Sequence, residues 1–480
     1  MTSTTQSSPR PPDTLPKVPA EVWRVAAVVI TGSFMSTLGS SLVNVGLKTI
    51  AGVLHAPLSN AQWVATGYLI AFAAALPVTA WLSRRMGAGR LWLWALAGFT
   101  VASAACSLAP NLGALIALRA VQGLCGALLV PTGQTVIGEI AGPERMGRVL
   151  NATKIVVVLG PVIGPTIGGL LIRSLSWHWL FLVNVPVGVV ALALGSRLVP
   201  RGVPTKGRPF DFGGFLLIAA GLPLVLYGIT IAERQGLTDT RVLATLLSGI
   251  VAMGLFAWRS LTVATPVLDL RLFRNRVYTA ATTSVFFTGA ALLGTMILLP
   301  LYYQLIRHEG VVTSGLLMLG IGCGSALSMP FGGPITDRVG GGIVSAAGLT
   351  LSLAGVLPMA FLDARTGYLI LLPLQAAVGF GLGLSAMPSL SVAYATVPRE
   401  RLPDATSEAN IIQRVGGAVG TAVLVMVLET NGTATDSSFH AACLWLAGAV
   451  FIALCQSLWL TKVESTRRKQ ELTRRSTPKG

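Results

Sequence analysis

Long apolar stretches recur along the chain from Val25 to Leu460, with short polar segments between them. A helix of about 20 apolar residues crosses the hydrocarbon core of a bilayer, whereas buried strands are much shorter. The pattern therefore predicts about fourteen membrane-spanning helices. They lie near 24–48, 61–82, 91–109, 112–140, 148–171, 179–199, 212–231, 241–261, 277–303, 311–335, 343–362, 367–396, 405–429 and 439–461.

Composition agrees with this pattern. Of the 480 residues, 53% are hydrophobic and only 11% are charged, and the mean hydropathy is +0.71. Soluble domains carry about 25% charged residues. We therefore expect an all-α polytopic membrane protein.

The net charge of +17 first suggests a nucleic acid partner, but the distribution of the charges argues against one. Basic residues gather in every second loop, and the intervening loops hold few. This is the positive-inside bias, which predicts that both termini are cytoplasmic in a multi-pass protein of the cell membrane. The predicted inner side holds Arg84, Arg85, Arg90, Arg145, Arg148, Arg197, Arg201, Lys206, Arg208, Arg259, Arg271, Arg274, Arg276, Arg338, Arg399 and Arg401.

The ends of the chain and its cysteines carry no sign of a catalytic or metal site. Residues 1–20 are polar and proline-rich, which is typical of a disordered cytoplasmic leader and not of a signal peptide. Residues 463–480 form a basic cytoplasmic tail. The five cysteines fall within predicted helices at unrelated spacings, which indicates buried thiols. We expect no metal and no cofactor.

The chain repeats itself at a long offset. Arg145 precedes Gly160 by the same separation as Arg401 precedes Gly416, and both arginines follow a similar loop. Similar loops on one side of the membrane indicate a parallel repeat of two six-helix halves. The predicted units are an N-terminal half at 21–200, an inserted two-helix hairpin at 201–265 and a C-terminal half at 266–462.

A stripe of small residues marks the fifth predicted helix. Gly160, Gly164 and Gly168 recur every four residues and share one face, where another helix can approach closely. Pro161 and Pro165 share a second face and bend the helix. The stripe is interpreted as a pivot between two moving parts, with tight static packing as the alternative.

Two arginines, Arg119 and Arg414, fall inside predicted spans, where each needs a cavity or a partner. Arg119 is expected either to bind substrate or tune a proton site, or to cap carbonyls of a broken helix. The deep core holds no obvious carboxylate, so neutral or anionic lipophilic molecules fit better than cations. Further wall candidates are the polar Ser40, Ser41, Asn44, Gln134 and Thr135 and the aromatic Trp63, Tyr68, Phe286 and Phe287.

Several motifs carry a resemblance to a known family. Gly160, Pro161, Gly164, Pro165, Gly168 and Gly169 match an antiporter motif, 177–181 match the entry to the sixth helix, and 119–123 match an intramembrane arginine motif that includes Gln122. In these residues the chain resembles the fourteen-helix drug:proton antiporters of the major facilitator superfamily. The resemblance implies that Arg119 and Gln122 belong to the cavity or the coupling machinery.

The resemblance implies a monomeric exporter of lipophilic small molecules, such as drugs or antibiotics, that works by alternating access and is coupled to protons. The chain departs from the family where Gly39 replaces an acid of the first helix. A facilitator or a differently coupled metabolite exporter therefore stays open, as does a transport-silent membrane sensor with the same fold. An enzyme is not expected, because no catalytic constellation lies in the core.

A second departure concerns the predicted inner surface. Arg84 stands where the family has an inner-loop aspartate, and Asp404 and Glu408 lie one turn apart at the start of the thirteenth helix. We predict that Arg84 pairs with Glu408 or Asp404 when the inner side is closed, with orientation in the membrane as the alternative role of the arginine. The predicted cytoplasmic gate comprises Arg84, Arg85, Asp337, Arg338, Asp404 and Glu408.

Overall fold

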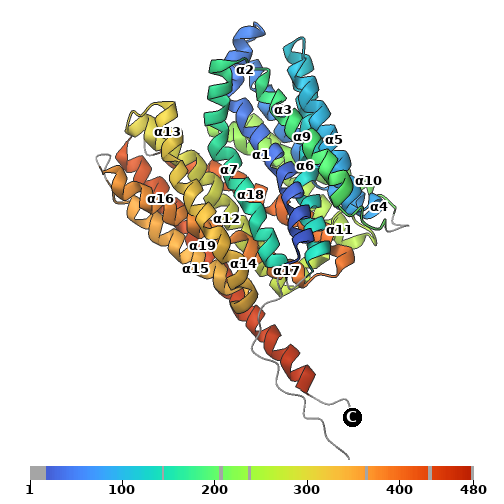
Figure 1. The fold of residues 1–480 in the computed structure, drawn as a ribbon. Coiled ribbons are helices and arrows are strands. Elements are labelled where there is room, and N and C mark those ends of the chain that lie inside the picture. The colour runs from blue at the N-terminus through green and yellow to red at the C-terminus, as the bar shows by residue number, and fades with distance from the viewer. Residues whose placement is uncertain are drawn as a thin grey trace, which may run out of the picture.

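The computed structural model describes residues 18–142, 145–204, 209–235, 239–362, 366–430 and 435–476. Within these ranges the chain is all-helical and has no strand (Figure 1). Eleven of the described helices are long and apolar enough to cross a membrane, and a bent helix pair raises the number to 12. The all-α membrane fold is thereby confirmed, whereas the predicted count of fourteen spans is not.

The N-terminal helices pack on one another as a first group, coloured blue to green in Figure 1. The closest pairs are α1 with α7, α5 with α6, and α3 with α6. The group comprises α1 (Ala20–Val53), α2 (Leu58–Ala61), α3 (Trp63–Ala75), α4 (Val78–Met86), α5 (Ala88–Ser107), α6 (Leu112–Ala141), α7 (Met146–Ser174), α8 (Trp179–Leu182) and α9 (Asn184–Leu198).

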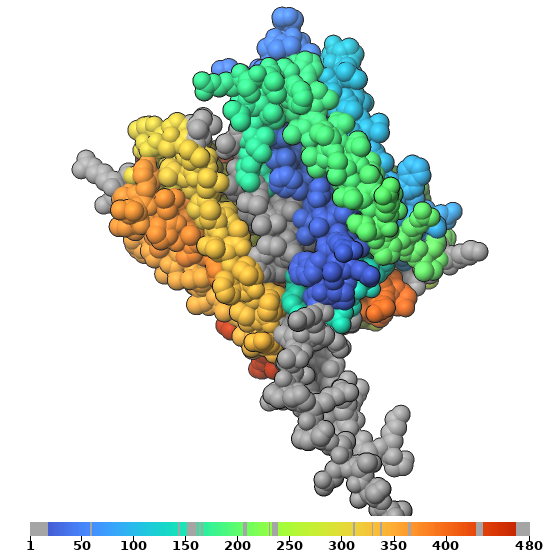
Figure 2. Space-filling model, viewed as in Figure 1, coloured from blue at the N-terminus to red at the C-terminus, as the bar shows by residue number. Residues whose placement is uncertain are grey.

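The C-terminal helices form a second group, yellow to red, which lies beside the first in Figures 1 and 2. Here α12 packs on α18 and α19, and α16 packs on α14 and α15. The group comprises η1 (Leu270–Arg274), α12 (Arg276–Leu301), η2 (Tyr302–Ile306), α13 (Val311–Leu317), α14 (Leu319–Val339), α15 (Gly341–Met359), α16 (Tyr368–Gly383), α17 (Ala386–Ala395), η3 (Arg399–Arg401), α18 (Leu402–Thr430) and α19 (Asp436–Ser476).

Between the groups in sequence lies a helical hairpin, α10 (Phe212–Gln235) and α11 (Thr240–Thr262). The two helices pack on each other, and α10 also contacts α3 and α18. Asp211 holds the base of the hairpin: its Oδ1 accepts the Arg259 Nε–H at 2.8 Å and the Gly214 backbone N–H at 2.9 Å. Asp211 thus joins the two helices of the hairpin, and α10 sets the hairpin against both groups.

The two groups meet through a few helices. α7 contacts α14 and α17, while α18 contacts α4 and α6. The span formed by α3 and α4 bends by 58° at a break that contains Pro77. Proline supplies no backbone N–H and clashes with the preceding turn, so a bend at this position is expected.

The last helix differs from its prediction. α19 continues to Ser476, well past the predicted end of the span near residue 461. Figure 1 shows this helix leaving the bundle at the end where α4 and α17 lie. The backbone N–H of Gly342 donates to Glu464 at 3.1 Å, so the beginning of the predicted tail is a helix that caps α15. We call this end of the bundle the predicted cytoplasmic end.

Candidate functional site

A cavity of about 190 Å³ lies between the two groups of helices. Its walls come from α1, α3 and α6 on one side and from α12 and α18 on the other. It is lined by Ser36, Thr37, Ser40, Tyr68, Leu69, Phe72, Val130, Gly289, Leu292, Leu293, Met296, Asn410, Gln413 and Arg414.

Arg414 is the one charged side chain among these lining residues. Its guanidinium carbon lies 3.8 Å from the centroid of the Phe72 ring, which belongs to the other group of helices. A guanidinium over an aromatic face is held by a cation–π attraction, and its edge N–H groups stay available for other acceptors. Arg414 is half-buried and lines the cavity, so its N–H groups can bind an acceptor there. This geometry supports the predicted cavity role of Arg414.

The opposite wall carries hydroxyl groups on an apolar surface. The Tyr68 phenol donates to the Ser36 carbonyl at 3.2 Å, and the Ser36 hydroxyl donates to the Gly126 carbonyl at 3.2 Å. These hydrogen bonds hold the side chains of Ser36 in α1 and Tyr68 in α3, both of which line the cavity. Leucine, methionine and valine side chains make up much of the remaining lining. The arrangement suits a mostly apolar molecule with one polar or acidic group.

Arg119 lies away from this cavity, inside the first group. It is 1% exposed, donates through Nε to the Val64 carbonyl at 3.1 Å and through Nη1 to the Gln122 side chain at 2.6 Å. Gln122 in turn donates to the Ser103 hydroxyl at 2.6 Å. Since Val64 lies in the first turn of α3, which follows the short helix α2, the geometry matches the carbonyl-capping alternative for Arg119.

The other predicted wall residues divide between the cavity and its surroundings. Ser40 lines the cavity, whereas Asn44 is exposed and is not among the lining residues. Ser41 faces Gly164 of α7. Gln134 accepts an N–H from Asn410 at 2.7 Å, so it joins the two groups beside the cavity.

Sequence reasoning missed several lining residues, among them Ser36, Thr37, Phe72 and Asn410. A signal was present for Ser36, because Ser36 and Ser40 are spaced by one turn and share a face of α1. No comparable pattern marks Phe72, which lies in an apolar helix whose rotation the sequence does not set.

The glycine stripe packs against α1. A Cβ added to Gly160 would lie 2.7 Å from the Thr37 hydroxyl, and one added to Gly164 would lie 2.4 Å from the Ser41 hydroxyl. Gly168 faces Leu42, whereas Gly169 has open space around it. Because α1 and α7 belong to one group, the stripe is tightly packed within that group in this structure. The side chains of Pro161 and Pro165 lie outside the described part.

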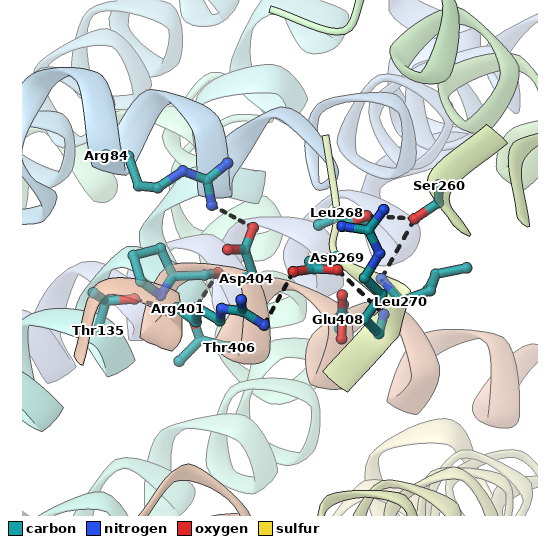
Figure 3. A network of polar contacts seen from close by, with 12 residues as sticks. Arg84, Thr135, Ser260, Leu268, Asp269, Leu270, Arg401, Asp404, Thr406 and Glu408 are labelled. Carbon is teal, nitrogen blue, oxygen red and sulfur yellow. Dashed lines mark hydrogen bonds and ion pairs between the residues drawn. The ribbon is translucent and has the colours of Figure 1, made fainter. Parts of the chain in front are cut away.

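Polar contacts join the two groups at the predicted cytoplasmic end. Arg84 of α4 and Asp404 of α18 form an ion pair (Figure 3). Two residues further along α18, the hydroxyls of Thr406 and of Thr135 in α6 lie 2.9 Å apart. Together with the bond from Asn410 to Gln134, these contacts close the space between α18 and the first group on that side of the cavity. The predicted pairing of Arg84 is confirmed, with Asp404 as its partner.

Glu408 lies on a different face of α18. Its Oε2 accepts the Tyr278 hydroxyl at 3.0 Å, and the residue is 2% exposed. A neighbouring ion pair joins Arg401 to Asp269 at 3.3 Å (Figure 3). The remaining gate candidates are peripheral: Arg85 lies over the Trp81 ring and is exposed, as is Arg338. The side chain of Asp337 is outside the described part.

A cavity between two packed groups of helices, closed at one end, is the arrangement of an alternating-access transporter. The family model of the Major Facilitator Superfamily matches residues 29–421 and 315–478. The chain belongs to this superfamily. It is therefore a multi-pass membrane transporter.

Relatives of this major facilitator include drug-resistance proteins and an export protein. The Multidrug resistance protein B homolog of Mycobacterium tuberculosis is 34% identical over 409 residues, which cover 84% of this chain and 76% of the relative. The Tetracenomycin C resistance and export protein of Streptomyces glaucescens is 28% identical over 410 residues, or 85% of this chain and 76% of the relative. The fold resembles the crystal structure of the human organic anion transporter MFSD10, with a TM-score of 0.63 at 15% identity over 92% of this chain and 100% of that chain.

Proposed function

We propose that this transporter exports lipophilic small molecules from the cell by alternating access. Neutral and anionic molecules are its favoured substrates, and a drug or antibiotic is the expected kind of cargo. The proposal includes a monomer in the cell membrane with both termini cytoplasmic. It also assigns the movement to two halves, residues 21–200 and 266–462, with the hairpin of 201–265 inserted between them.

The observation that carries the proposal is the cavity around Arg414. Side chains of both groups line it, so a relative movement of the groups changes its access. Its surface is mostly apolar, and its single charged lining side chain is basic. A permanent cation placed there would face Arg414 in a medium of low dielectric constant, where like charges repel strongly. An anion or a hydrogen-bond acceptor would find N–H donors instead.

The export direction and the antibiotic class of cargo are supported by the relatives. The names of the mycobacterial and streptomycete proteins describe multidrug resistance and tetracenomycin export. We also propose that this export is coupled to protons. The runner-up is a facilitator or a differently coupled exporter, because Gly39 lacks the carboxylate that the resemblance places in the first helix.

Flux in inside-out membrane vesicles tests this proposal. The probes are three lipophilic fluorophores of matched size, one neutral, one anionic and one a quaternary ammonium compound. We expect saturable uptake of the first two, weak uptake of the third, and a partial loss of uptake when a protonophore removes the pH gradient. The matched control is the Arg241→Gln variant, whose arginine is exposed on α11, outside the cavity.

Each alternative gives a different result in that assay. Uptake that persists without the pH gradient favours the facilitator or another coupling ion. Absence of uptake of all three probes, from vesicles with verified protein insertion, favours the transport-silent sensor. Preferred uptake of the quaternary ammonium compound contradicts the substrate class proposed from Arg414.

A further inference from the structure

Glu408 is a buried acid at the predicted cytoplasmic end. Among the described residues, the ion pairs at this end involve its neighbours and leave Glu408 without a basic partner. Asp404 pairs with Arg84 and Asp269 pairs with Arg401. Among the described residues, the Glu408 carboxyl receives only the Tyr278 hydroxyl, and its second oxygen, Oε1, is fully buried with no hydrogen-bond partner. A carboxylate with an unpartnered buried oxygen is costly to hold in the ionised state.

The hydrogen bonds around Tyr278 distinguish the two protonation states of Glu408. The phenol oxygen lies 3.0 Å from Glu408 Oε2 and 3.2 Å from the Ala405 carbonyl oxygen. A phenol has one O–H and can donate to only one of these acceptors. When Glu408 carries a proton, its O–H donates to the phenol oxygen and the phenol donates to Ala405. Both short contacts then become hydrogen bonds, which is impossible when Glu408 is ionised.

The charged and titratable groups around Glu408 also favour its protonated state. On its own helix the nearest acid is Asp404, one turn away, and the loop before η1 contributes Asp269. α12 contributes Tyr278, and α17 contributes the buried Tyr394, which lies within electrostatic reach of Glu408. In this cluster Arg84 pairs with Asp404 and Arg401 pairs with Asp269 (Figure 3). An ionised Glu408 would also face the negative charges of Asp404 and Asp269, and like charges repel strongly at a buried position.

We propose that Glu408 is a proton-binding site whose occupancy is linked to the contact between Arg84 and Asp404. With the two groups in contact at the predicted cytoplasmic end, Glu408 holds a proton. When α4 and α6 separate from α18, water reaches the cluster and accepts that proton, which leaves an ionised Glu408 one helical turn from Asp404. The repulsion between these two acids then opposes the return of the closed arrangement until a proton is bound again.

Linkage makes the relation reciprocal: if closure favours proton binding, proton binding favours closure by the same factor. The inference rests on the proposed function, in that opening at this end is taken to be one step of the transport cycle. It also supplies a carboxyl group for proton coupling in a chain that has Gly39 at the first-helix position. Arginine cannot fill this role, because its guanidinium keeps its proton.

A distance measurement across the contact tests the proposal without using transport. Spin labels are placed at the exposed positions Arg90 of α5 and Glu400 of η3, after the cysteines that are not fully buried, Cys125, Cys323 and Cys455, are replaced by serine. The distance distribution is recorded for purified protein in lipid nanodiscs, without substrate, between about pH 5 and about pH 9.

We expect the short-distance population to grow as the pH falls, by at most about tenfold per pH unit, the limit for one proton. Glu408→Gln, which resembles the protonated side chain, should keep the short distance at every pH. Glu408→Asp should retain a pH-dependent distance. The matched control is Glu139→Gln, since Glu139 is an exposed acid of α6 near the same end. It should behave like the unmodified protein.

Two outcomes would overturn the inference: a distance distribution of the unmodified chain that ignores pH, or a Glu408→Gln variant that follows pH as the unmodified chain does. Failure of the proposed function looks different. In that case the pH-dependent distance change and its loss in Glu408→Gln persist, while vesicles show no flux of the lipophilic probes.

Discussion

Arg84 of α4 and Asp404 of α18 form an ion pair between the two groups of helices, although 320 residues separate them in the chain. The side chains are only 10% and 3% exposed, so water screens their attraction weakly. Asp404 also lies in the first turn of α18, where the helix dipole favours an acid. Glu408 is excluded as the partner because its carboxylate faces Tyr278.

Reversal of the charge of Arg84 should impair transport. In Arg84→Glu two acids meet at a largely buried position, and breaking such a pair costs about 3–5 kcal/mol. We expect the rate of probe uptake in vesicles to fall at least tenfold. Adding Asp404→Arg should restore a substantial part of it, whereas adding Glu408→Arg should not. Equal uptake in the two double variants would show that the ion pair does not control transport.

Gly164→Leu should destabilise the packing of α7 on α1. A Cβ at this position already meets the Ser41 hydroxyl at 2.4 Å, so a larger side chain forces the helices apart. Overpacking of this kind costs about 1–3 kcal/mol. We expect a lower melting temperature of the purified protein and loss of uptake. Gly169→Leu is the matched control, because nothing lies within 4 Å of its added Cβ. If both variants melt alike, the stripe is not a tight interface.

Arg414→Gln should change substrate preference more than it changes overall activity. Charge-assisted hydrogen bonds contribute about 1.5–3 kcal/mol, so an anionic probe should lose about tenfold or more in apparent affinity. A neutral probe of the same size should lose little. Concentration-dependent uptake of both probes measures the difference, with Arg241→Gln as the exposed control. Equal losses of apparent affinity for the two probes would show that Arg414 does not recognise the charge of the substrate.

Gly39→Asp should make uptake more sensitive to collapse of the pH gradient. An added Cβ lies 3.4 Å from Phe99 and 3.7 Å from the Asn184 amide nitrogen, which are ordinary contacts. That buried nitrogen has no hydrogen-bond partner among the described residues, so a carboxyl group at position 39 can accept from it. Uptake is compared with and without a protonophore, and Gly39→Asn serves as the uncharged control. Identical sensitivity of the two variants would contradict a coupling role for this position.

Much of the architecture followed from local pattern. The apolar stretches placed most helices within a few residues, because a span must satisfy its own backbone hydrogen bonds over a fixed membrane thickness. The glycine spacing at 160, 164 and 168 indicated a close helix contact, since residues four apart share a face. These properties depend on one segment at a time, so the sequence alone predicts them.

The tertiary structure decided which segments meet. The sequence predicted a partner for Arg84 but left two acids open, and only the rotation of α18 directs Asp404 to α4 and Glu408 to Tyr278. The same limit applies to the arginines: the folded chain puts Arg414 at the cavity and Arg119 on the Val64 carbonyl. Helix rotation and inter-helix contacts arise from packing across hundreds of residues. Local periodicity in an apolar helix carries little information about them, because lipid and protein neighbours are both apolar.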